Sequence, residues 1–145
     1  MCHETNQADY VFAPDTPIIS GVVQETPPVV LVVEDDSAVR QPLVKFLQMR
    51  QYNVVTAETA DEGLDAIRQH HPDAAIIDLR LKRGSGREVV VSMPPEVPVI
   101  IFSGLRSESA DLEVIRPRTR LVEKPYSLIM LMDTLEDMLE QSRAQ

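Results

Sequence analysis

VVLVVEDD, residues 29–36, is the stretch that decides the fold. Its first five residues are aliphatic and mostly β-branched, which is typical of a strand buried on both faces of a parallel sheet. Similar runs follow at residues 74–77 and 97–102, whereas residues 53–56 and 119–122 are shorter and more polar. We therefore predict three buried central strands, with the two more polar strands at the edges of the sheet.

A helical pattern follows each predicted strand. Apolar side chains repeat with the 3.6-residue period after Asp36 and, most clearly, after Ser127, and a weaker pattern covers residues 107–115. Signatures of the capping-box type, Ser or Thr with Glu three residues later, begin the second and third helices at Thr59 and Ser85. The chain thus reads as five βα units, which predicts an α/β fold with helices on both faces of a parallel sheet.

Composition narrows the class of protein. The 145 residues are enough for one ordinary domain, and 43% hydrophobic residues can supply its core. A formal net charge of −9 argues against a nucleic-acid-binding surface, and no apolar run approaches the roughly 18 residues of a membrane span. The one cysteine, Cys2, cannot form an internal disulfide, so we expect a cytoplasmic protein.

Two segments have alternative interpretations. Residues 1–28 contain four prolines and no sustained period, so we interpret them as a disordered arm ahead of a folded domain at residues 29–145. A docking peptide around Tyr10, Val11 and Phe12 is the alternative for that arm. The basic run at residues 116–120 is interpreted as a solvated edge, with a partner-docking patch as its alternative.

Polar side chains follow the predicted strands where each strand ends. Glu34 and Asp35 follow the first strand, Asp78 the third, Ser103 the fourth and Lys124 the fifth. The carboxyl ends of parallel strands meet at one edge of a sheet, so these groups are expected to converge. Converging carboxylates repel each other unless they hold a cation, and oxygen ligands suit Mg²⁺. A carboxylate in such a site can accept a phosphoryl group, with an ammonium and a hydroxyl neutralising the phosphoryl oxygens.

The order and placement of these motifs resemble those of response-regulator receiver domains of bacterial two-component systems. The resemblance extends over residues 29–142 and rests on VVEDD at 32–36, IIDLRL at 76–81, Gly86, FSG at 102–104 and VEKPY at 122–126. It implies a flavodoxin-like (βα)5 fold, a doubly wound parallel sheet with strand order 2-1-3-4-5.

The resemblance also implies roles for individual residues. Asp78 would be the phosphoacceptor, Ser103 the hydroxyl that moves toward the phosphoryl group, and Lys124 the cation that pairs with a phosphoryl oxygen. The Lys124–Pro125 peptide bond would be cis. The family usually has an aromatic switch residue three positions before this lysine, where this chain has Leu121. The implied cofactor is Mg²⁺, and its ligands would be Glu34, Asp35, Asp78 and the backbone carbonyl of Arg80.

The expected function is that of a single-domain response regulator, since the sequence ends at Gln145 soon after the last helical pattern. It would accept a phosphoryl group from a sensor histidine kinase or phosphotransfer protein and lose it by slow self-dephosphorylation, without being a turnover enzyme. Output would be contact with a downstream protein target through the last two helices, where Ile129 and Met130 lie off the apolar stripe. Homodimerisation is left open.

Two other functions compete with this one. A receiver-fold interaction module that works without phosphorylation is supported by Leu121 and opposed by the intact acidic and lysine positions. A phosphatase of the haloacid-dehalogenase type would need an Asp-x-Asp motif on the first strand, which Glu34-Asp35-Asp36 does not provide.

Overall fold

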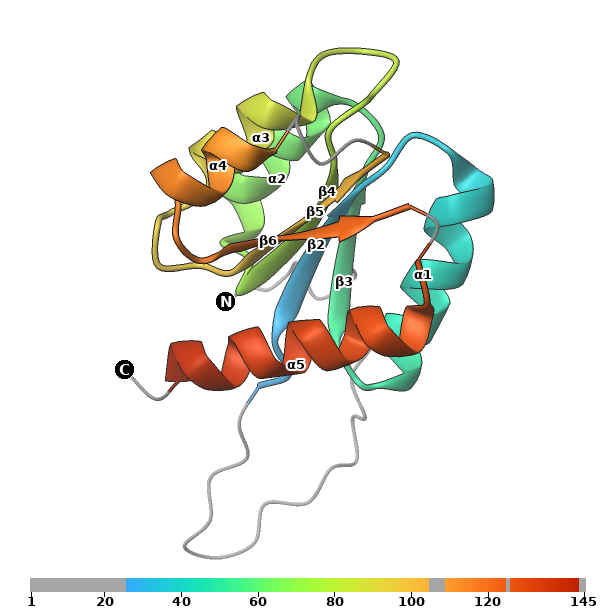
Figure 1. Cartoon of the computed structure of the whole chain (residues 1–145). Coiled ribbons are helices and arrows are strands. Elements are labelled where there is room, and N and C mark those ends of the chain that lie inside the picture. Colours follow the sequence, from blue (N-terminus) through green and yellow to red (C-terminus); the bar gives the residue numbers. More distant parts are fainter. Residues whose placement is uncertain (1–25, 105–108, 125, 144–145) are drawn as a thin grey trace, which may run out of the picture.

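The computed structural model describes residues 26–104, 109–124 and 126–143. Its strands and helices alternate along the chain (Figure 1). The strands are β2 (Val29–Val33), β3 (Asn53–Ala57), β4 (Ala74–Asp78), β5 (Val99–Ser103) and β6 (Thr119–Glu123). The helices are α1 (Ser37–Met49), α2 (Ala60–His70), α3 (Gly86–Ser92), α4 (Ala110–Ile115) and α5 (Leu128–Arg143).

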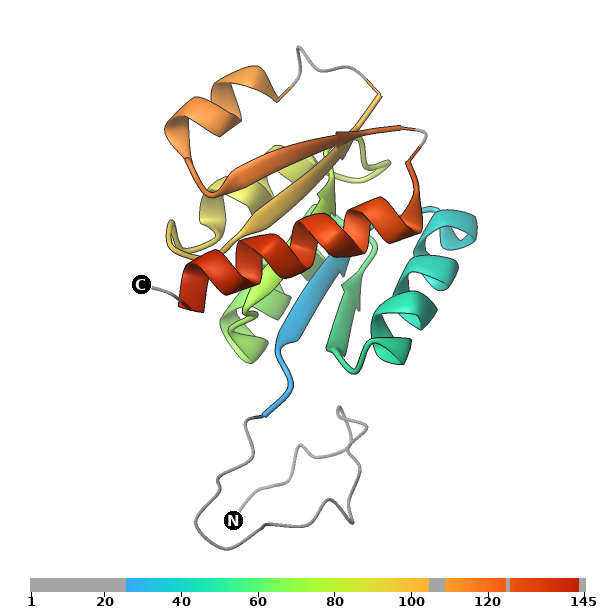
Figure 2. The ribbon, with the colours of Figure 1, turned by 60° about the horizontal axis from the view of Figure 1, so that its bottom comes forward.

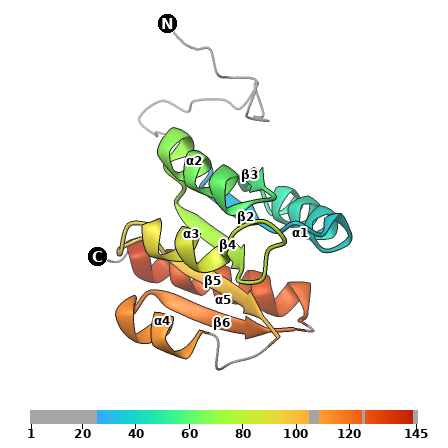
Figure 3. The same cartoon turned by 90° about the horizontal axis from the view of Figure 1, so that it is seen from above.

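The strands form one parallel sheet in the order β3-β2-β4-β5-β6, which Figure 3 shows from above. When the five strands are counted from the N-terminus, this order is 2-1-3-4-5. The predicted doubly wound fold is therefore confirmed. All residues of β2, β4 and β5 are buried, whereas β3 and β6 at the edges are partly exposed. Polarity along the sequence therefore predicted the edge strands correctly.

Helices cover both faces of the sheet because alternate strand residues point to opposite sides. On one face, Leu31 and Ile77 pack in a cluster with residues of α2, α3 and α4. On the other, Val32 and Ile76 pack with residues of α1 and α5. Figure 2 shows α5, in red, crossing in front of the strands. Two aliphatic layers thus hold the carboxyl ends of β2, β4 and β5 side by side.

Side-chain caps begin the first three helices, as expected for the second and third. The Asp36 carboxylate accepts a hydrogen bond from the Ala38 N–H at 2.9 Å, the Thr59 hydroxyl one from the Glu62 N–H at 3.1 Å, and the Ser85 hydroxyl one from the Arg87 N–H at 3.2 Å. These caps satisfy backbone donors that a helix leaves unpaired at its start. The observed part of the fourth helix begins at Ala110, and residues 105–108 lie outside the described ones.

The N-terminal segment joins the sheet at the start of β2. The backbone carbonyl of Pro28 accepts a hydrogen bond from the Asn53 N–H at 3.0 Å. The disordered arm expected for residues 1–28 falls mostly on residues 1–25, which lie outside the described residues. Among the described helices, none combines the length and apolar character that crossing a lipid bilayer requires.

Candidate functional site

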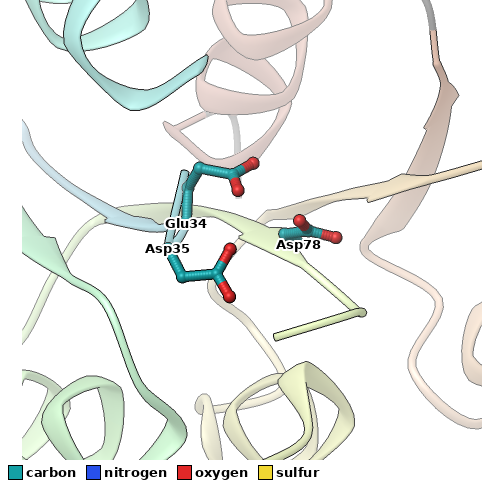
Figure 4. A group of neighbouring side chains, drawn as sticks. All are labelled: Glu34, Asp35 and Asp78. Carbon is teal, nitrogen blue, oxygen red and sulfur yellow. The ribbon is translucent and has the colours of Figure 1, made fainter. Parts of the chain in front are cut away.

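Three carboxylates meet at the carboxyl ends of the two central strands β2 and β4 (Figure 4). The parallel register pairs Val33 with Ile77, so the residues that follow, Glu34 and Asp78, are neighbours across the sheet. Asp35 comes next on the β2 side, and one oxygen of each carboxylate lies within 4.8 Å of the others. The predicted convergence of these acidic groups is therefore present in the structure.

The surroundings of Glu34 shift its pKa. Its side chain is buried, and Oε2 accepts a hydrogen bond from the Asp36 N–H at 3.1 Å. Oε1 has no hydrogen-bond partner, and the nearest cation, Lys124 Nζ, is 4.0 Å away. Burial raises the pKa of the Glu34 carboxyl to about 7, and the negative charge of Asp78 adds to the effect. The site therefore contains a buried carboxyl group whose charge is only partly compensated, by Lys124 at 4.0 Å.

Asp78 is buried and bonded on both oxygens. Oδ1 accepts a hydrogen bond from the Arg80 N–H at 3.0 Å, and Oδ2 accepts one from Lys124 Nζ at 3.1 Å. Asp35, on the other side of the site, accepts a hydrogen bond from the Lys82 N–H at 2.6 Å. The loop after β4 thus donates backbone N–H groups to two of the three carboxylates, a contact that the sequence did not predict.

That loop is held in place by glycine at its end. The Gly86 N–H donates to the Leu79 carbonyl at 3.2 Å, and a Cβ atom at Gly86 would lie 2.1 Å from the Asp78 carbonyl oxygen. Only glycine permits so close an approach of α3 to the end of β4. The position of Gly86 eight residues after Asp78 was part of the family resemblance, and this contact gives its physical reason.

The carboxylates line an open cavity of about 300 Å³ at this edge of the sheet. Most of its lining residues are charged, and the full set is Glu34, Asp35, Asp36, Val39, Asp78, Arg80, Leu81, Lys82 and Lys124. The cavity is therefore wide enough for a small anionic group and ordered water at the three carboxylates.

Lys124 and Ser103, the other predicted site residues, differ in their position relative to this cavity. Lys124 lies between Asp78 and Glu34, within reach of both. Ser103 is buried at the end of β5, and its backbone carbonyl accepts the Lys124 N–H at 3.1 Å. Ser103 is not among the residues that line the cavity. Pro125 lies outside the described residues, and so does the cis Lys124–Pro125 peptide bond that the resemblance implies.

An aromatic pair next to the site was missed by the sequence reasoning. The ring of Tyr126 stacks on that of Phe102, with centroids 4.5 Å apart and planes 10° from parallel. Burial raises the pKa of the Tyr126 phenol to about 12, and the Glu34 and Asp78 carboxylates add to the shift. Leu121, at the position where the family usually has its aromatic residue, packs against the core on the opposite face. An aromatic residue directly after Lys124-Pro125, in a chain with few aromatics, was the available signal.

The donor set fits a divalent cation of the Mg²⁺ type. All three side chains offer hard oxygen ligands, and the unpartnered Oε1 of Glu34 is a buried acceptor that lacks a positive neighbour at hydrogen-bond distance. Arg80 lines the same cavity, and its carbonyl remains a predicted ligand. Asp36 is occupied as the N-cap of α1, which agrees with leaving it out of the ligand set.

Comparison with known proteins identifies the class of protein. The family model described as "Response regulator receiver domain" matches residues 30–136. The chain belongs to this family. The resemblance seen in the motifs is thereby confirmed.

Individual relatives agree with this assignment. The chain is 33% identical over 101 residues to the regulatory protein VirG of Rhizobium rhizogenes, covering 67% of this chain and 42% of VirG. It is 27% identical over 115 residues to the response regulator RR06 of Streptococcus pneumoniae serotype 2, covering 77% of this chain and 53% of RR06. The chain thus spans about half the length of these curated relatives.

Solved structures show the same fold. A CheY-like receiver domain protein from Methanospirillum hungatei JF-1 superimposes with a TM-score of 0.75 at 24% sequence identity, covering 81% of this chain and 98% of that one. At this identity the likeness concerns the fold alone. The family match at residues 30–136, with the strand order and the carboxylate cluster beside it, places the chain among response regulator receiver domains.

Proposed function

We propose that this receiver domain accepts a phosphoryl group on Asp78 from a histidine kinase or phosphotransfer protein, in a Mg²⁺-dependent reaction in the cytoplasm. The observation that carries the proposal is the contact of Lys124 Nζ with Asp78 Oδ2 at 3.1 Å, beside two further carboxylates within 4.8 Å. A buried aspartate with a lysine at one oxygen and a cation site beside it has the charges that an aspartyl phosphate requires.

In this proposal, the residues of the site have different roles in phosphoryl transfer. An Asp78 oxygen would attack the phosphorus atom of a phosphohistidine, forming an O–P bond while the N–P bond breaks and its electron pair stays on the imidazole nitrogen. Lys124, already at Asp78, would then pair with a phosphoryl oxygen. Glu34, Asp35, Asp78 and the Arg80 carbonyl would hold Mg²⁺, which when bound neutralises part of the negative charge on the phosphoryl group.

Ser103 has a second role in the proposal. Its backbone carbonyl accepts a hydrogen bond from the Lys124 N–H, which joins the ends of β5 and β6 beside the site. A phosphoryl group on Asp78 would attract the Ser103 hydroxyl as a hydrogen-bond donor. Self-dephosphorylation by water would return the domain to its starting state.

Phosphorylation of Asp78 is tested directly with small phosphodonors. Incubation with Mg²⁺ and acetyl phosphate or phosphoramidate is expected to add about 80 Da, the mass of a phosphoryl group. Asp78→Asn should remove the adduct completely, because the amide is not a nucleophile for this reaction, while Asp133→Asn on the exposed side of α5 should keep it. Intact-mass spectrometry, before and after brief treatment with base, measures the adduct.

Two outcomes would contradict the proposal. An unmodified wild-type protein would favour an interaction module that works without phosphorylation. An adduct that survives in Asp78→Asn would move the phosphoacceptor to another residue.

We further propose that output is protein–protein contact at the start of α5. Ile129 and Met130 lie there with 61% and 68% of their surface exposed, large values for apolar side chains. Ile129→Glu with Met130→Glu is expected to weaken self-association of the phosphorylated protein by about tenfold, since burying two carboxylates opposes contact. Sedimentation velocity over a concentration series measures this.

Met49→Glu is the matched control for that experiment. Met49 is 70% exposed, at the end of α1. If the α5 double variant and the α1 variant associate like wild type, the α5 surface is not the contact between copies.

A further inference from the structure

Lys124 follows the end of an edge strand. β6 is the last strand in the order of the sheet and pairs with β5, and Figure 3 shows the two side by side. The Lys124 side chain is 35% exposed, and its Nζ lies 3.1 Å from Asp78 Oδ2. A lysine side chain is long and flexible, so fixing its ammonium in one place has an entropic cost. The position of Lys124 at Asp78 therefore depends on how the end of β6 is held against β5.

Two contacts hold the chain around Lys124 against the end of β5. The Lys124 N–H donates to the Ser103 carbonyl at 3.1 Å. Beyond Pro125 in the sequence, the ring of Tyr126 stacks on the ring of Phe102, with their centroids 4.5 Å apart. Phe102 and Ser103 are consecutive residues of β5, a strand that is buried along its whole length. Lys124 thus lies between a backbone contact and a ring contact that both reach the same short piece of strand.

Phe102 provides a firm base for this stack. Its side chain is fully buried, in the layer of apolar side chains between the sheet and helices α1 and α5. In the sheet it pairs with Asp78 of β4 on one side and with Val122 of β6 on the other. Its carbonyl also accepts a hydrogen bond from the Leu79 N–H at 3.2 Å. Phe102 therefore lies between the strand that carries the proposed phosphoacceptor and the strand that leads to Lys124.

Tyr126 borders both the apolar layer and the acidic site. It is half-buried and packs against the same cluster of apolar side chains as Phe102. Burial raises the pKa of its phenol to about 12, and the Glu34 and Asp78 carboxylates add to the shift because their charges disfavour a phenolate nearby. The phenol is therefore neutral at physiological pH. Tyr126 acts at this site through the contacts of its ring and not through a charge.

A stack of two rings defines the position of the chain more closely than an aliphatic contact does. Aromatic pairs prefer particular geometries, with centroids about 4.5–7 Å apart, and this pair lies at 4.5 Å with its planes 10° from parallel. Because a single residue separates Tyr126 from Lys124, a shift of the ring also shifts the lysine. A misplacement of about 1 Å in a reacting group can slow a reaction by roughly a hundredfold.

We propose that Tyr126 is a positioning residue for phosphoryl transfer, and that its stacking on Phe102 holds Lys124 where the ammonium pairs with the phosphoryl group on Asp78. This inference rests on the proposed phosphoacceptor role of Asp78. The ring carries the function and the hydroxyl does not, so phenylalanine is expected to replace Tyr126 and leucine is not.

The rate of phosphorylation tests this role. With Mg²⁺ and phosphoramidate, Tyr126→Leu is expected to gain the phosphoryl adduct about tenfold more slowly than wild type. Tyr126→Phe keeps the stack and should react at a rate within about twofold of wild type. Phe102→Leu removes the other ring and should slow the reaction as Tyr126→Leu does. Intact-mass spectrometry over a time course measures these rates, and circular dichroism shows that each variant is folded.

A double-mutant cycle tests whether Tyr126 acts through Lys124. Lys124→Met keeps an unbranched side chain without the charge and should slow phosphorylation by about a hundredfold. Adding Tyr126→Leu to Lys124→Met should slow the reaction no further, because no ammonium remains to be positioned. A further tenfold loss in the double variant would show that Tyr126 acts independently of Lys124, and the proposal would be wrong.

Tyr52→Leu is the matched control for loss of packing. Tyr52 is also half-buried and packs against the same apolar layer, but it directly precedes β3, at the end of the sheet opposite the acidic site. Its replacement should lower the urea midpoint of unfolding, as Tyr126→Leu does, and should leave the phosphorylation rate at the wild-type value. Equal slowing by both variants would attribute the effect to general destabilisation and would contradict a positioning role.

A second measurement needs no phosphorylation. Lysine side chains are acetylated with an N-hydroxysuccinimide ester, and peptide mass spectrometry compares the rate at Lys124 with the rate at Lys45, which is exposed on α1. Lys124 should react about threefold faster in Tyr126→Leu than in wild type, since an amine released from Asp78 is more accessible, and should react as in wild type in Tyr126→Phe. A wild-type protein that gains no phosphoryl adduct would refute the phosphoacceptor role. Unchanged acetylation of Lys124 in Tyr126→Leu would instead refute its positioning by the stack.

Discussion

Replacing Gly86 with alanine is expected to destabilise the domain by about 3 kcal/mol, the upper end of what overpacking usually costs. The added Cβ would lie 2.1 Å from the Asp78 carbonyl oxygen, 2.8 Å from the Leu79 Cα and 2.9 Å from the Asp78 carbonyl carbon. All three are backbone atoms, so no side chain can rotate away to make room. Either α3 or the end of β4 must move, and the end of β4 carries the proposed phosphoacceptor.

Urea denaturation followed by circular dichroism measures this loss of stability. Gly104→Ala is the matched control, because a Cβ there would meet nothing within 4 Å and should change the unfolding free energy by less than about 0.5 kcal/mol. We also expect Gly86→Ala to slow phosphorylation, because the Asp78 carboxylate and the Arg80 N–H bonded to it shift together with the strand end. A Gly86→Ala protein as stable as Gly104→Ala would contradict this account of the loop.

Replacing Glu34 with glutamine is expected to stabilise the metal-free protein strongly at pH 8 and by less than about 1 kcal/mol at pH 5. The pKa of Glu34 rises from 4.5 to about 7 on folding, mainly because the group is buried. Between these two values the folded protein binds more protons than the unfolded chain, so stability falls as pH rises. The cost is absent below about pH 4.5, grows up to about pH 7, and amounts to roughly 3 kcal/mol above it.

The amide of glutamine does not ionise, so it avoids this cost but also lacks the negative charge that Mg²⁺ binds. Urea denaturation at pH 5 and pH 8, with and without Mg²⁺, therefore tests both properties of Glu34 at once. Without metal at pH 8 the variant should be the more stable protein. With Mg²⁺ the order should reverse, because a cation beside Glu34 and Asp78 favours the ionised wild-type carboxylate.

Glu140→Gln, on the exposed side of α5, is the control and should change neither profile. If Glu34→Gln were less stable than wild type at pH 8 without metal, the buried carboxylate would be stabilising and its raised pKa would be wrong. If Mg²⁺ stabilised wild type and Glu34→Gln equally, Glu34 would not take part in metal binding.

The amino-acid sequence by itself determined the class of fold and the edge at which the site forms. Strands buried on both faces need continuous aliphatic residues, as in residues 29–33 and 74–77, and that pattern is local. The polar groups of the site follow directly from where those runs stop, since parallel strands end at a common edge. Asp36 could be proposed as a helix cap for the same reason, because a cap acts on N–H groups only two or three residues away.

Only the tertiary structure decided how these groups interact. The raised pKa of Glu34 depends on burial and on Asp78, a residue 44 positions away in the chain. The hydrogen bond from the Lys82 N–H to Asp35 and the stacking of Phe102 on Tyr126 likewise join separate loops and strands. Burial, electrostatic interaction and ring stacking vary with distances of a few ångströms between distant residues. Those distances are set by the packing of helices against both faces of the sheet.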